Sequence, residues 1–432
     1  MKKSINSILE KIESIDGITI SGAVTGVSYP LIKGICDEAG LGEIVIITDG
    51  IREILGEVTG FSGETILVFP WDNIEGINSS WKLIPTGKKF TVKVSPNMTG
   101  RIFDGLGNPI DDKGDIDMGS QMAVDTQVIS PLSRKRINEP LFTHIPAIDG
   151  LLTIGKGQRV GIFAGSGVGK STLLGNLIRE SASDINVVCL VGERGREVRD
   201  FIEDVLGEDG MARTVMVVST SDTPSIIRWK APLTATAIAE YFRRQGKDVL
   251  LLMDSLTRFA RAGRELGLSM GEIPLRRGYP ASVFAMMPKL LERAGVTSHG
   301  SITGIYTVLV EGGDMEEPVA DEVRGILDGH IVMDRTLASE GLFPAIDISS
   351  SVSRIMNDIV TDEHKSISIE IRKRIANYYQ NRDLVKVGAY VPGNDPDVDI
   401  ALGTIKQIQA FVHNNESLDY ESVIRKMREI VS

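Results

Sequence analysis

Residues 164–171 combine glycines, a lysine and a serine at the spacing of a phosphate-binding loop. They read Ala-Gly-Ser-Gly-Val-Gly-Lys-Ser, after the apolar run 160–163 and before residues 172–178, which have helical spacing. A strand, a glycine-rich loop and a helix are the context that such a loop requires. Loop N–H groups and the start of the helix then face phosphate oxygens. The predicted contacts are Gly165, Ser166, Gly167, Val168, Gly169, Lys170, Ser171 and Thr172.

Two side chains of this region fit a nucleotide with its magnesium ion. Lys170 can reach the β- and γ-phosphates, and the hydroxyl of Ser171 can ligate Mg²⁺. A second ligand, Asp254, follows the apolar run Val249–Met253 and so lies at the carboxyl end of a predicted buried strand, where it binds the metal through water. The usual pattern begins with glycine, whereas this loop begins with Ala164, a small residue that leaves the turn possible.

A candidate for activating water follows the next predicted strand, in Gly192-Glu193-Arg194-Gly195-Arg196-Glu197. Glu193 is placed as a water-polarising base. Arg194 either orients that carboxylate or contacts phosphate. The alternative is a charged surface loop with internal ion pairs, which is our interpretation of Arg196, Glu197 and Arg199.

Phosphoryl transfer often uses a mobile arginine to neutralise charge on the γ-phosphate. Arg354 ends a run of small residues at 349–353 and projects from an approachable loop. Its spacing alone favours a solvated arginine.

Composition limits the class of protein. The chain has 432 residues, which predicts two or three domains, and 42% hydrophobic and 24% charged residues, as in soluble globular proteins. Its net charge of −11 argues against a broad nucleic-acid surface. The two cysteines favour buried thiols in a reducing compartment. No apolar stretch is long enough to span a membrane, and no secretory signal is recognisable. Together these features predict a cytoplasmic protein.

The pattern of apolar residues divides the chain into four parts. Residues 1–17 contain an amphipathic helix at 4–15, residues 18–95 contain short strands (including 42–48, 65–69 and 89–94), and residues 95–140 read as a linker. Apolar strands alternate with helices from about 150 to 350, which predicts an α/β fold with a parallel sheet. The ATPase-type domain is assigned to 96–350 and a helical domain to 351–432, with helices at 367–380, 398–412 and 422–430.

Several motifs together resemble one family. The chain is similar to the type III secretion ATPases, which are related to the β subunit of the F-type ATP synthase. Gly388-Ala389-Tyr390 and Gly393-Asn394-Asp395-Pro396 favour the flagellar export branch over the virulence branch. The resemblance covers about residues 18–430 and rests on 164–171, 192–197, 254–259, 278–284, 326–332 and 351–354.

The resemblance implies a six-stranded N-terminal barrel, a RecA-like nucleotide domain and a C-terminal helical domain. It also implies a homohexamer that hydrolyses ATP at its subunit interfaces. Glu193 then matches the catalytic glutamate, and Arg354 matches an arginine finger that acts on the ATP of the neighbouring subunit. Phe343 and Tyr390 match the aromatic positions that enclose adenine, and Arg258 matches a position near the phosphates. Without the resemblance, core packing would be the preferred interpretation of both aromatic residues.

The implied partners are those of a flagellar protein export apparatus. They are a central stalk protein, the membrane export gate, export substrates with their chaperones, and a stator-like regulator that docks on residues 4–15. The chain would be cytoplasmic and peripherally associated with the inner membrane. Packing of residues 4–15 on their own barrel is an equally good interpretation.

Three other functions are alternatives to flagellar export. They are a virulence secretion ATPase, a rotary ATP synthase subunit and a hexameric RNA motor. The β-rich part carries no basic and aromatic cluster of the kind that binds RNA, so no nucleic-acid partner is expected. A non-catalytic nucleotide-binding subunit is disfavoured by Glu193 together with Lys170.

Two positions depart from the family pattern. His144 stands where a glycine is expected, which puts a local turn in question. Ile273 stands where a proline is expected, in a loop that faces the pore of the ring in the family.

Overall fold

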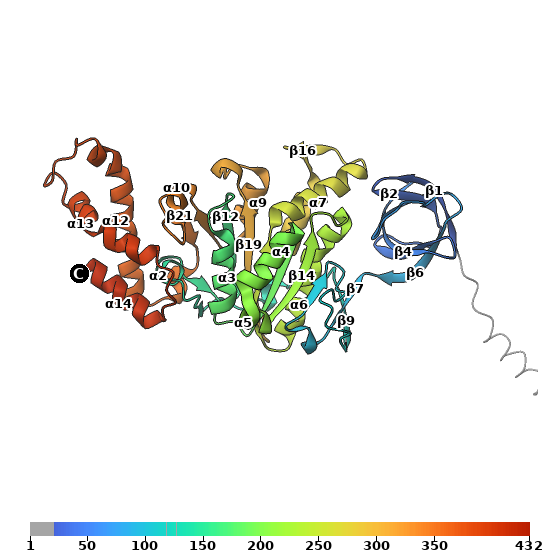
Figure 1. Ribbon diagram of the computed structural model, residues 1–432, viewed down its shortest axis with the longest axis horizontal. Coiled ribbons are helices and arrows are strands. Elements are labelled where there is room, and N and C mark those ends of the chain that lie inside the picture. The colour runs from blue at the N-terminus through green and yellow to red at the C-terminus, as the bar shows by residue number, and fades with distance from the viewer. Residues whose placement is uncertain (1–20, 118, 127) are drawn as a thin grey trace, which may run out of the picture. The chain divides into compact units, whose positions relative to one another are not determined.

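The computed structural model describes residues 21–117, 119–126 and 128–432, and these form two compact units. One unit contains the chain up to Thr91 together with Leu266–Glu272, and the other contains Val92–Glu265 and Ile273–Ser432. The predicted helix at 4–15 lies outside the described residues. Figure 1 shows the chain coloured from its N-terminus to its C-terminus.

The first unit contains a closed antiparallel barrel with the strand order β1-β2-β5-β4-β3-β6. Alternate residues such as Val45, Ile47 and Val68 point into its core and are fully buried. This confirms the six-stranded barrel that the resemblance implies. The strands are β1 (Gly22–Ser28), β2 (Leu31–Ile35), β3 (Glu43–Thr48), β4 (Glu53–Ser62), β5 (Thr65–Pro70) and β6 (Lys82–Lys89).

The prediction that residues 89–94 form a strand of the barrel is wrong. The barrel ends with β6 at Lys89, and β7 (Thr91–Val94) pairs instead with β9 (Ser120–Ala123) in a separate two-stranded sheet. Phe90, which belongs to neither strand, separates the two. The apolar alternation continues from one element into the next. Periodicity alone therefore does not show where the chain changes its pairing partner.

The centre of the second unit is a nine-stranded sheet, mostly parallel, with the order β21-β20-β12-β19-β15-β13-β14-β8 and β18 paired with β19. The predicted strands at 160–163 and Val249–Met253 are present, as β12 and β15. Its strands are β8 (Ile102–Asp104), β12 (Arg159–Ala164), β13 (Ile185–Glu193), β14 (Thr214–Thr220), β15 (Asp248–Asp254), β18 (Gly295–Val296), β19 (Ser301–Leu309), β20 (Gly329–Met333) and β21 (Ile346–Ser353). Two of them cross the expected boundaries: β8 comes from the predicted linker, and β21 continues to Ser353.

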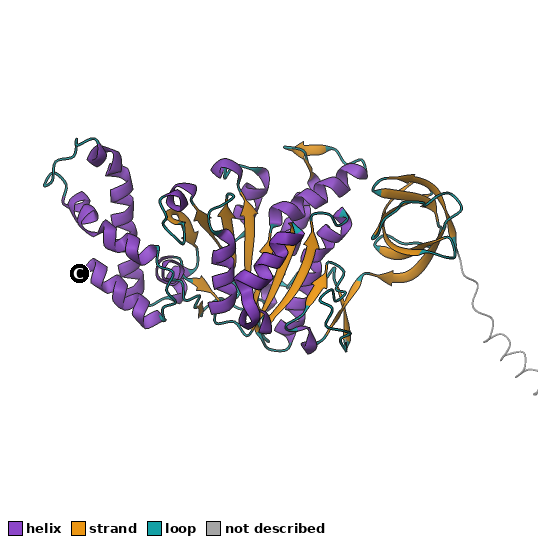
Figure 2. Ribbon diagram, viewed as in Figure 1, coloured by secondary structure: helices purple, strands orange, loops and turns teal. Residues whose placement is uncertain are grey.

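Helices lie on both faces of this sheet (Figure 2). Alternate strand residues, among them Ile162 and Leu252, share one hydrophobic core with α3. The long α6 packs against β13, β14 and β15. The helices before the C-terminal layer are α2 (Pro146–Leu151), α3 (Lys170–Glu180), α4 (Gly195–Asp200), α5 (Gly207–Ala212), α6 (Ser225–Arg244), α7 (Leu256–Ser269), α8 (Ala281–Leu291), α9 (Pro318–Ile326), α10 (Arg335–Ser339) and α11 (Met356–Ile359).

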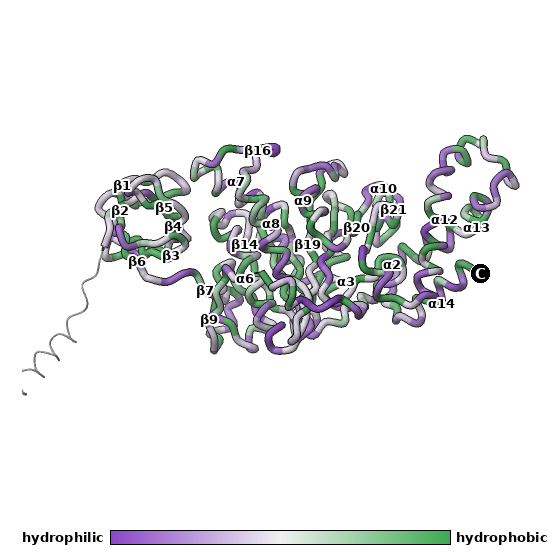
Figure 3. Tube along the Cα trace, turned by 180° about the vertical axis from the view of Figure 1, so that it is seen from behind, coloured by the Kyte–Doolittle hydropathy of each residue, from purple (hydrophilic) through white to green (hydrophobic). Residues whose placement is uncertain are grey.

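Three helices form the C-terminal layer: α12 (Asp362–Lys386), α13 (Pro396–Val412) and α14 (Tyr420–Val431). Each begins at a side-chain cap, because Thr361, Asp395 and Asp419 accept hydrogen bonds from backbone N–H groups of the first turn. Hydrophobic and hydrophilic segments alternate along them (Figure 3), as expected for helices with one buried face. Buried residues of all three helices, among them Ile371, Phe411 and Met427, belong to the same core as α3.

Short elements complete the unit. The paired strands are β10 (Pro140–Leu141) with β11 (Ile154–Gly155), and β16 (Pro274–Arg276) with β17 (Tyr279–Pro280). Single helical turns occur at Pro96–Met98, Pro131–Ser133, Phe201–Leu206 and Glu311–Gly313. Among the described residues, no helix is both long and apolar enough to cross a membrane.

His144 forms the turn where the family pattern has glycine. Its φ is 58°, in the left-handed region that favours glycine. Its N–H donates to Asp149 Oδ2 at 2.8 Å, and its ring Nδ1 lies 3.1 Å from the Leu418 carbonyl oxygen. These contacts hold a histidine in a conformation that glycine adopts more easily.

Candidate active site

The phosphate-binding loop joins the end of β12 to the start of α3. Gly167 and Gly169 have φ of 78° and 83°, which only glycine adopts readily. Ala164 is the last residue of β12, where its carbonyl accepts a hydrogen bond from Val310 N at 3.1 Å. Ala164 therefore lies in regular strand, and its side chain does not disturb the loop.

The other predicted phosphate contacts follow along this loop. Gly165 and Ser166 come directly after the strand, and Val168 is buried beneath the loop. Lys170, Ser171 and Thr172 form the first turn of α3, and the hydroxyl-bearing residues are exposed there. The backbone N–H groups of this turn are those that a helix leaves without internal partners.

Lys170 and Asp254 meet across the loop. Lys170 Nζ lies 2.5 Å from Asp254 Oδ1, and Asp254 ends β15 with a largely buried carboxylate. The same oxygen accepts a 2.6 Å hydrogen bond from the hydroxyl of Thr307, on the adjacent strand β19. The lysine thus neutralises the carboxylate when no phosphate is present to attract it.

The oxygen atoms of Ser171 and Asp254 fit a magnesium ion. Mg²⁺ prefers hard oxygen ligands and usually binds through one or two side chains plus substrate phosphates. Among the described residues there is no cluster of three or more carboxylate, histidine or cysteine ligands. These two residues would therefore hold the ion together with the nucleotide.

Glu193 lies at the end of β13, beside the strand that ends at Asp254. Arg258 of α7 holds its carboxylate: Nη2 donates to Oε2 at 3.2 Å, and Nε lies 3.1 Å from Oε1. The approach depends on Gly192, since a Cβ there would lie 2.9 Å from Arg258 Cδ.

Burial, the Asp254 charge and a hydrogen bond with Glu197 raise the pKa of Glu193 to about 7. Lys170 and Arg258 act in the opposite direction. A carboxyl group with a pKa near the working pH suits a general base.

Arg194 does not orient Glu193. Its side chain is 79% exposed and lies 3.4 Å from Glu197, while Arg258 contacts the catalytic candidate instead. Arg194 is the residue immediately before α4, and its side chain pairs with Glu197 of that helix. Arg196 and Arg199 form ion pairs along the same surface with Asp200 and Glu203.

Arg354 follows β21, two strands from β12 in the sheet, and lies at the amino ends of the parallel strands, whereas the phosphate-binding loop lies at their carboxyl ends. β21 runs antiparallel to β20 and places Ser353 beside Gly329, whereas Met333 lies beside Ala164. The strand from Gly329 to Met333 alone spans about 13 Å at roughly 3.3 Å per residue. Arg354 is exposed, and Nη2 has one long contact of 3.4 Å, to the Arg324 carbonyl oxygen. The structure therefore separates this arginine from the loop of its own chain.

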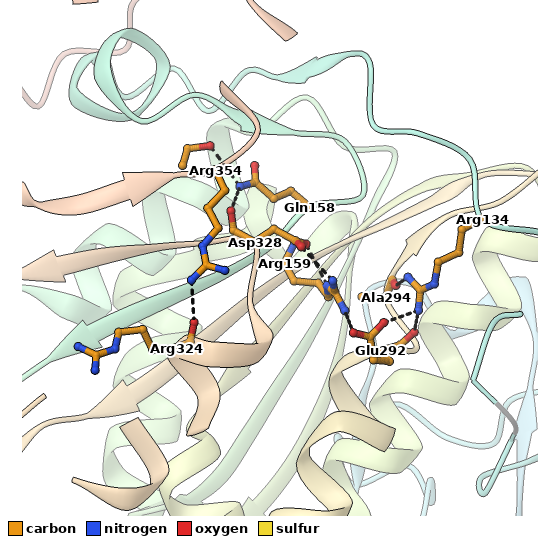
Figure 4. Close-up of polar contacts among 9 residues, drawn as sticks. Arg134, Gln158, Arg159, Glu292, Ala294, Arg324, Asp328 and Arg354 are labelled. Carbon is orange, nitrogen blue, oxygen red and sulfur yellow. Dashed lines mark hydrogen bonds and ion pairs between the residues drawn. The ribbon is translucent and has the colours of Figure 1, made fainter. Parts of the chain in front are cut away.

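Gln158 fixes the backbone that carries Arg354 (Figure 4). Its fully buried amide Nε2 lies 3.0 Å from the Asp328 carbonyl oxygen and 3.2 Å from Ser353 Oγ. The same Asp328 carbonyl accepts the N–H of Arg354 at 3.0 Å. The Asp328 carboxylate in turn accepts three hydrogen bonds from Arg159, one from its backbone N–H and two from its guanidinium group. The arginine thus has a rigid base and an exposed side chain.

The two aromatic candidates lie in different settings. The Phe343 ring packs on the phosphate-binding loop, because a Cβ on Gly169 would lie 3.2 Å from its carbons Cδ1 and Cε1. The Tyr390 hydroxyl contacts Asp399 Oδ1 at 2.9 Å and the Asp395 carbonyl at 3.0 Å. Phe343 is therefore beside the candidate site, whereas Tyr390 is tied to the loop between α12 and α13. Their joint contact with adenine stays a prediction.

Sequence reasoning missed Thr307 and Gln158. Thr307 is a polar residue in the apolar run 305–310, on the neighbour of the strand that ends at Asp254. That polarity was the available signal. Gln158 offered no comparable signal, because its partners are 170 and 195 residues away along the chain.

Comparisons with known proteins agree with this geometry. Residues 144–353 match the model of the ATP synthase alpha/beta family, nucleotide-binding domain, and residues 360–429 match the T3SS EscN ATPase C-terminal domain.

Named relatives cover nearly the whole chain. The flagellum-specific ATP synthase of Bacillus subtilis is 44% identical over 94% of this chain and 93% of its own. The type 3 secretion system ATPase of Xanthomonas euvesicatoria is 46% identical over 90% and 89%. The structure of the assembled ATPase EscN from the enteropathogenic E. coli type III secretion system aligns with a TM-score of 0.91 and 43% identity, over 95% of this chain and 100% of EscN.

Family membership therefore rests on sequence and structure along almost the full length. The chain belongs to the ATP synthase alpha/beta family, in the branch of the flagellum-specific and type 3 secretion ATPases, and it is an ATP-hydrolysing enzyme.

Proposed function

We propose that the chain is the Mg-ATP hydrolase of a flagellar type III export apparatus and that it works as a homohexameric ring. The observation that carries the ring is the position of Arg354, at the end of the parallel strands opposite to the end that bears its own phosphate-binding loop. A head-to-tail ring would bring the Arg354 side of one subunit to the nucleotide of the next. EscN, which is similar along nearly the whole chain, is an assembled ATPase.

Each residue of the site has a distinct role in the proposed reaction. The amides of residues 165–172 bind the phosphates, and Lys170 leaves Asp254 for the γ-phosphate. Glu193 accepts a proton from the attacking water while Arg258 keeps its carboxylate in place. Arg354 of the neighbouring subunit neutralises charge that develops on the transferred group. Arg194 is exposed and remains a candidate phosphate contact.

Ser171 and Asp254 would contribute the protein oxygens that hold Mg²⁺, which would neutralise negative charge on the phosphates when bound. Phe343, next to the loop, is positioned to contact adenine, with Tyr390 as its proposed counterpart.

The proposed partners follow from the relatives. EscN has been solved in complex with its central stalk EscO, which supports a stalk protein for this ring. A stator-like regulator on residues 4–15, the export gate, and substrates with chaperones belong to the same proposal. So does a peripheral position at the inner membrane. Relatives from flagellar and other secretion systems are about equally similar, and the Gly388–Pro396 motifs favour the flagellar apparatus.

Two single substitutions test the assigned roles. Arg354→Ala should lower the rate of ATP hydrolysis by about 10³-fold or more, because an arginine finger contributes 10³–10⁵. Glu193→Gln should also bind ATP without turnover. Both variants should keep wild-type nucleotide affinity in a fluorescence binding assay. Hydrolysis at the normal rate by assembled Arg354→Ala rings would disprove the trans finger, and the same result for Glu193→Gln would remove Glu193 from its role.

A further inference from the structure

We propose that Thr307 is a positioning residue that holds Asp254 ready for magnesium after Lys170 has moved to the phosphate. This inference rests on the proposed function, because it concerns the same metal site. It assigns a task to a side chain that touches neither nucleotide nor metal.

The contact is short and completely buried. Thr307 Oγ1 lies 2.6 Å from Asp254 Oδ1 and 3.3 Å from the Met253 carbonyl oxygen, and the residue has no exposed surface. A hydroxyl group at such a position is unfavourable unless it donates a hydrogen bond. The nearer acceptor is the carboxylate, so the hydroxyl proton points to Asp254.

The strand geometry explains why this partner is well placed. β19 and β15 are parallel neighbours, and the register pairs Tyr306 with Met253. Thr307 and Asp254 are the next residues on each strand. The hydroxyl is therefore fixed by the sheet, and it does not depend on a loop that moves when nucleotide binds.

Lys170 and Thr307 contact the same carboxylate oxygen, Oδ1. The lysine belongs to the phosphate-binding loop and is the mobile partner, since phosphate attracts its charge. Thr307 then remains as the donor on Oδ1 and would keep the carboxylate in place for the metal. Residues that support a metal ligand in this way typically change metal affinity 10–100-fold when they are removed.

The test compares three variants of the full chain. Thr307→Val removes the hydroxyl at nearly constant volume, and Thr307→Ala removes it with less risk of a clash. Thr307→Ser retains it. The matched control is Thr303→Val: Thr303 is also buried on β19, but its hydroxyl accepts the N–H of Gly157, far from Asp254.

The readout is binding of a fluorescent, non-hydrolysable ATP analogue, titrated with Mg²⁺ and repeated in EDTA. We expect Thr307→Val and Thr307→Ala to need about 10–100-fold more Mg²⁺ for half-maximal enhancement of binding. Binding in EDTA should stay at the wild-type value. Thr307→Ser and Thr303→Val should behave like the wild type, even where thermal unfolding shows some loss of stability.

The outcomes distinguish a failure of the role proposed for Thr307 from a failure of the proposed function. Unchanged Mg²⁺ dependence in a folded Thr307→Val or Thr307→Ala variant overturns the role of Thr307. Equal weakening in Mg²⁺ and in EDTA also overturns it, because that indicates a general structural effect. Absence of any Mg²⁺ enhancement in the wild-type chain would instead contradict the proposed function.

Discussion

At the scale of single residues, the Glu193 carboxyl group is held between opposing influences. Burial, Asp254 and Glu197 favour its protonated form, whereas Lys170 and Arg258 favour the ionised form. The net result is a pKa raised to about 7. The proposed base must be ionised to accept a proton from water. Its activity therefore depends on pH close to neutrality.

The first prediction concerns this pH dependence. kcat/KM for Mg-ATP should rise with pH through about 7, because it reports the ionisation of the free enzyme. Glu197→Gln should move the midpoint to lower pH, since the hydrogen bond with Glu197 raises the pKa of Glu193. Steady-state rates measured across pH at saturating Mg²⁺ check both effects.

ATP ionises in the same way in assays of the wild type and of Glu197→Gln. A difference between their pH midpoints therefore reports ionisation of the enzyme. Glu203→Gln serves as the control, because Glu203 pairs with Arg199 on the exposed surface. A midpoint that is identical in wild type and Glu197→Gln would show that Glu193 does not set the profile.

At the scale of elements, local patterns predicted the strands and helices that carry the site. The apolar runs before Ala164 and Asp254 are strands, and the helices after residue 362 begin at predictable caps. Pairing between distant segments was not predictable. β8 joins the sheet beside β14 although its sequence resembles a linker, and the partner of Glu193 is Arg258, which is 65 residues away along the chain. Sequence reasoning proposed that Arg194 either orients Glu193 or contacts phosphate, because proximity in the sequence does not show where a side chain is directed.

The C-terminal helices attach to the nucleotide domain partly through a neutral histidine. His364 of α12 is fully buried, with Nε2 2.8 Å from the Gly150 carbonyl oxygen and Nδ1 3.1 Å from the Tyr420 hydroxyl. In the neutral ring, Nε2–H donates to the carbonyl oxygen and Nδ1 can accept from the tyrosine hydroxyl. Burial lowers the pKa of His364 below its ordinary value of 6.5.

A second prediction follows for stability. Because the folded-state pKa is lowered, this contribution to stability is fully present above pH 6.5 and is lost as pH falls through the lower, folded-state value. His364→Gln should therefore make the free energy of unfolding less dependent on pH below 6.5, although it lowers stability at neutral pH. Urea unfolding across that range measures the slope.

The control for this slope is His299→Gln, which changes an exposed histidine. It should leave the slope at the wild-type value. An unchanged slope in His364→Gln would contradict a neutral, buried His364 at this contact.

At the scale of the whole molecule, the chain contains the parts of two half-sites. The phosphate-binding loop, Asp254 and Glu193 lie at the carboxyl ends of the parallel strands, and Arg354 lies at their amino ends. Gln158 and Asp328 hold that second part rigidly. Under the proposed mechanism a complete site requires two subunits, and the ring is a condition for catalysis.

Mixing two inactive variants tests this requirement most directly. Arg354→Ala subunits keep the phosphate-binding loop, and Lys170→Ala subunits keep the arginine. Co-assembly of equal amounts should restore ATP hydrolysis at about a quarter of the interfaces, if subunits mix at random around a head-to-tail ring. The account predicts that each variant alone is inactive and that mixed rings regain this share of wild-type activity. Mixed rings that form but stay inactive, or Arg354→Ala rings that are active alone, would contradict it.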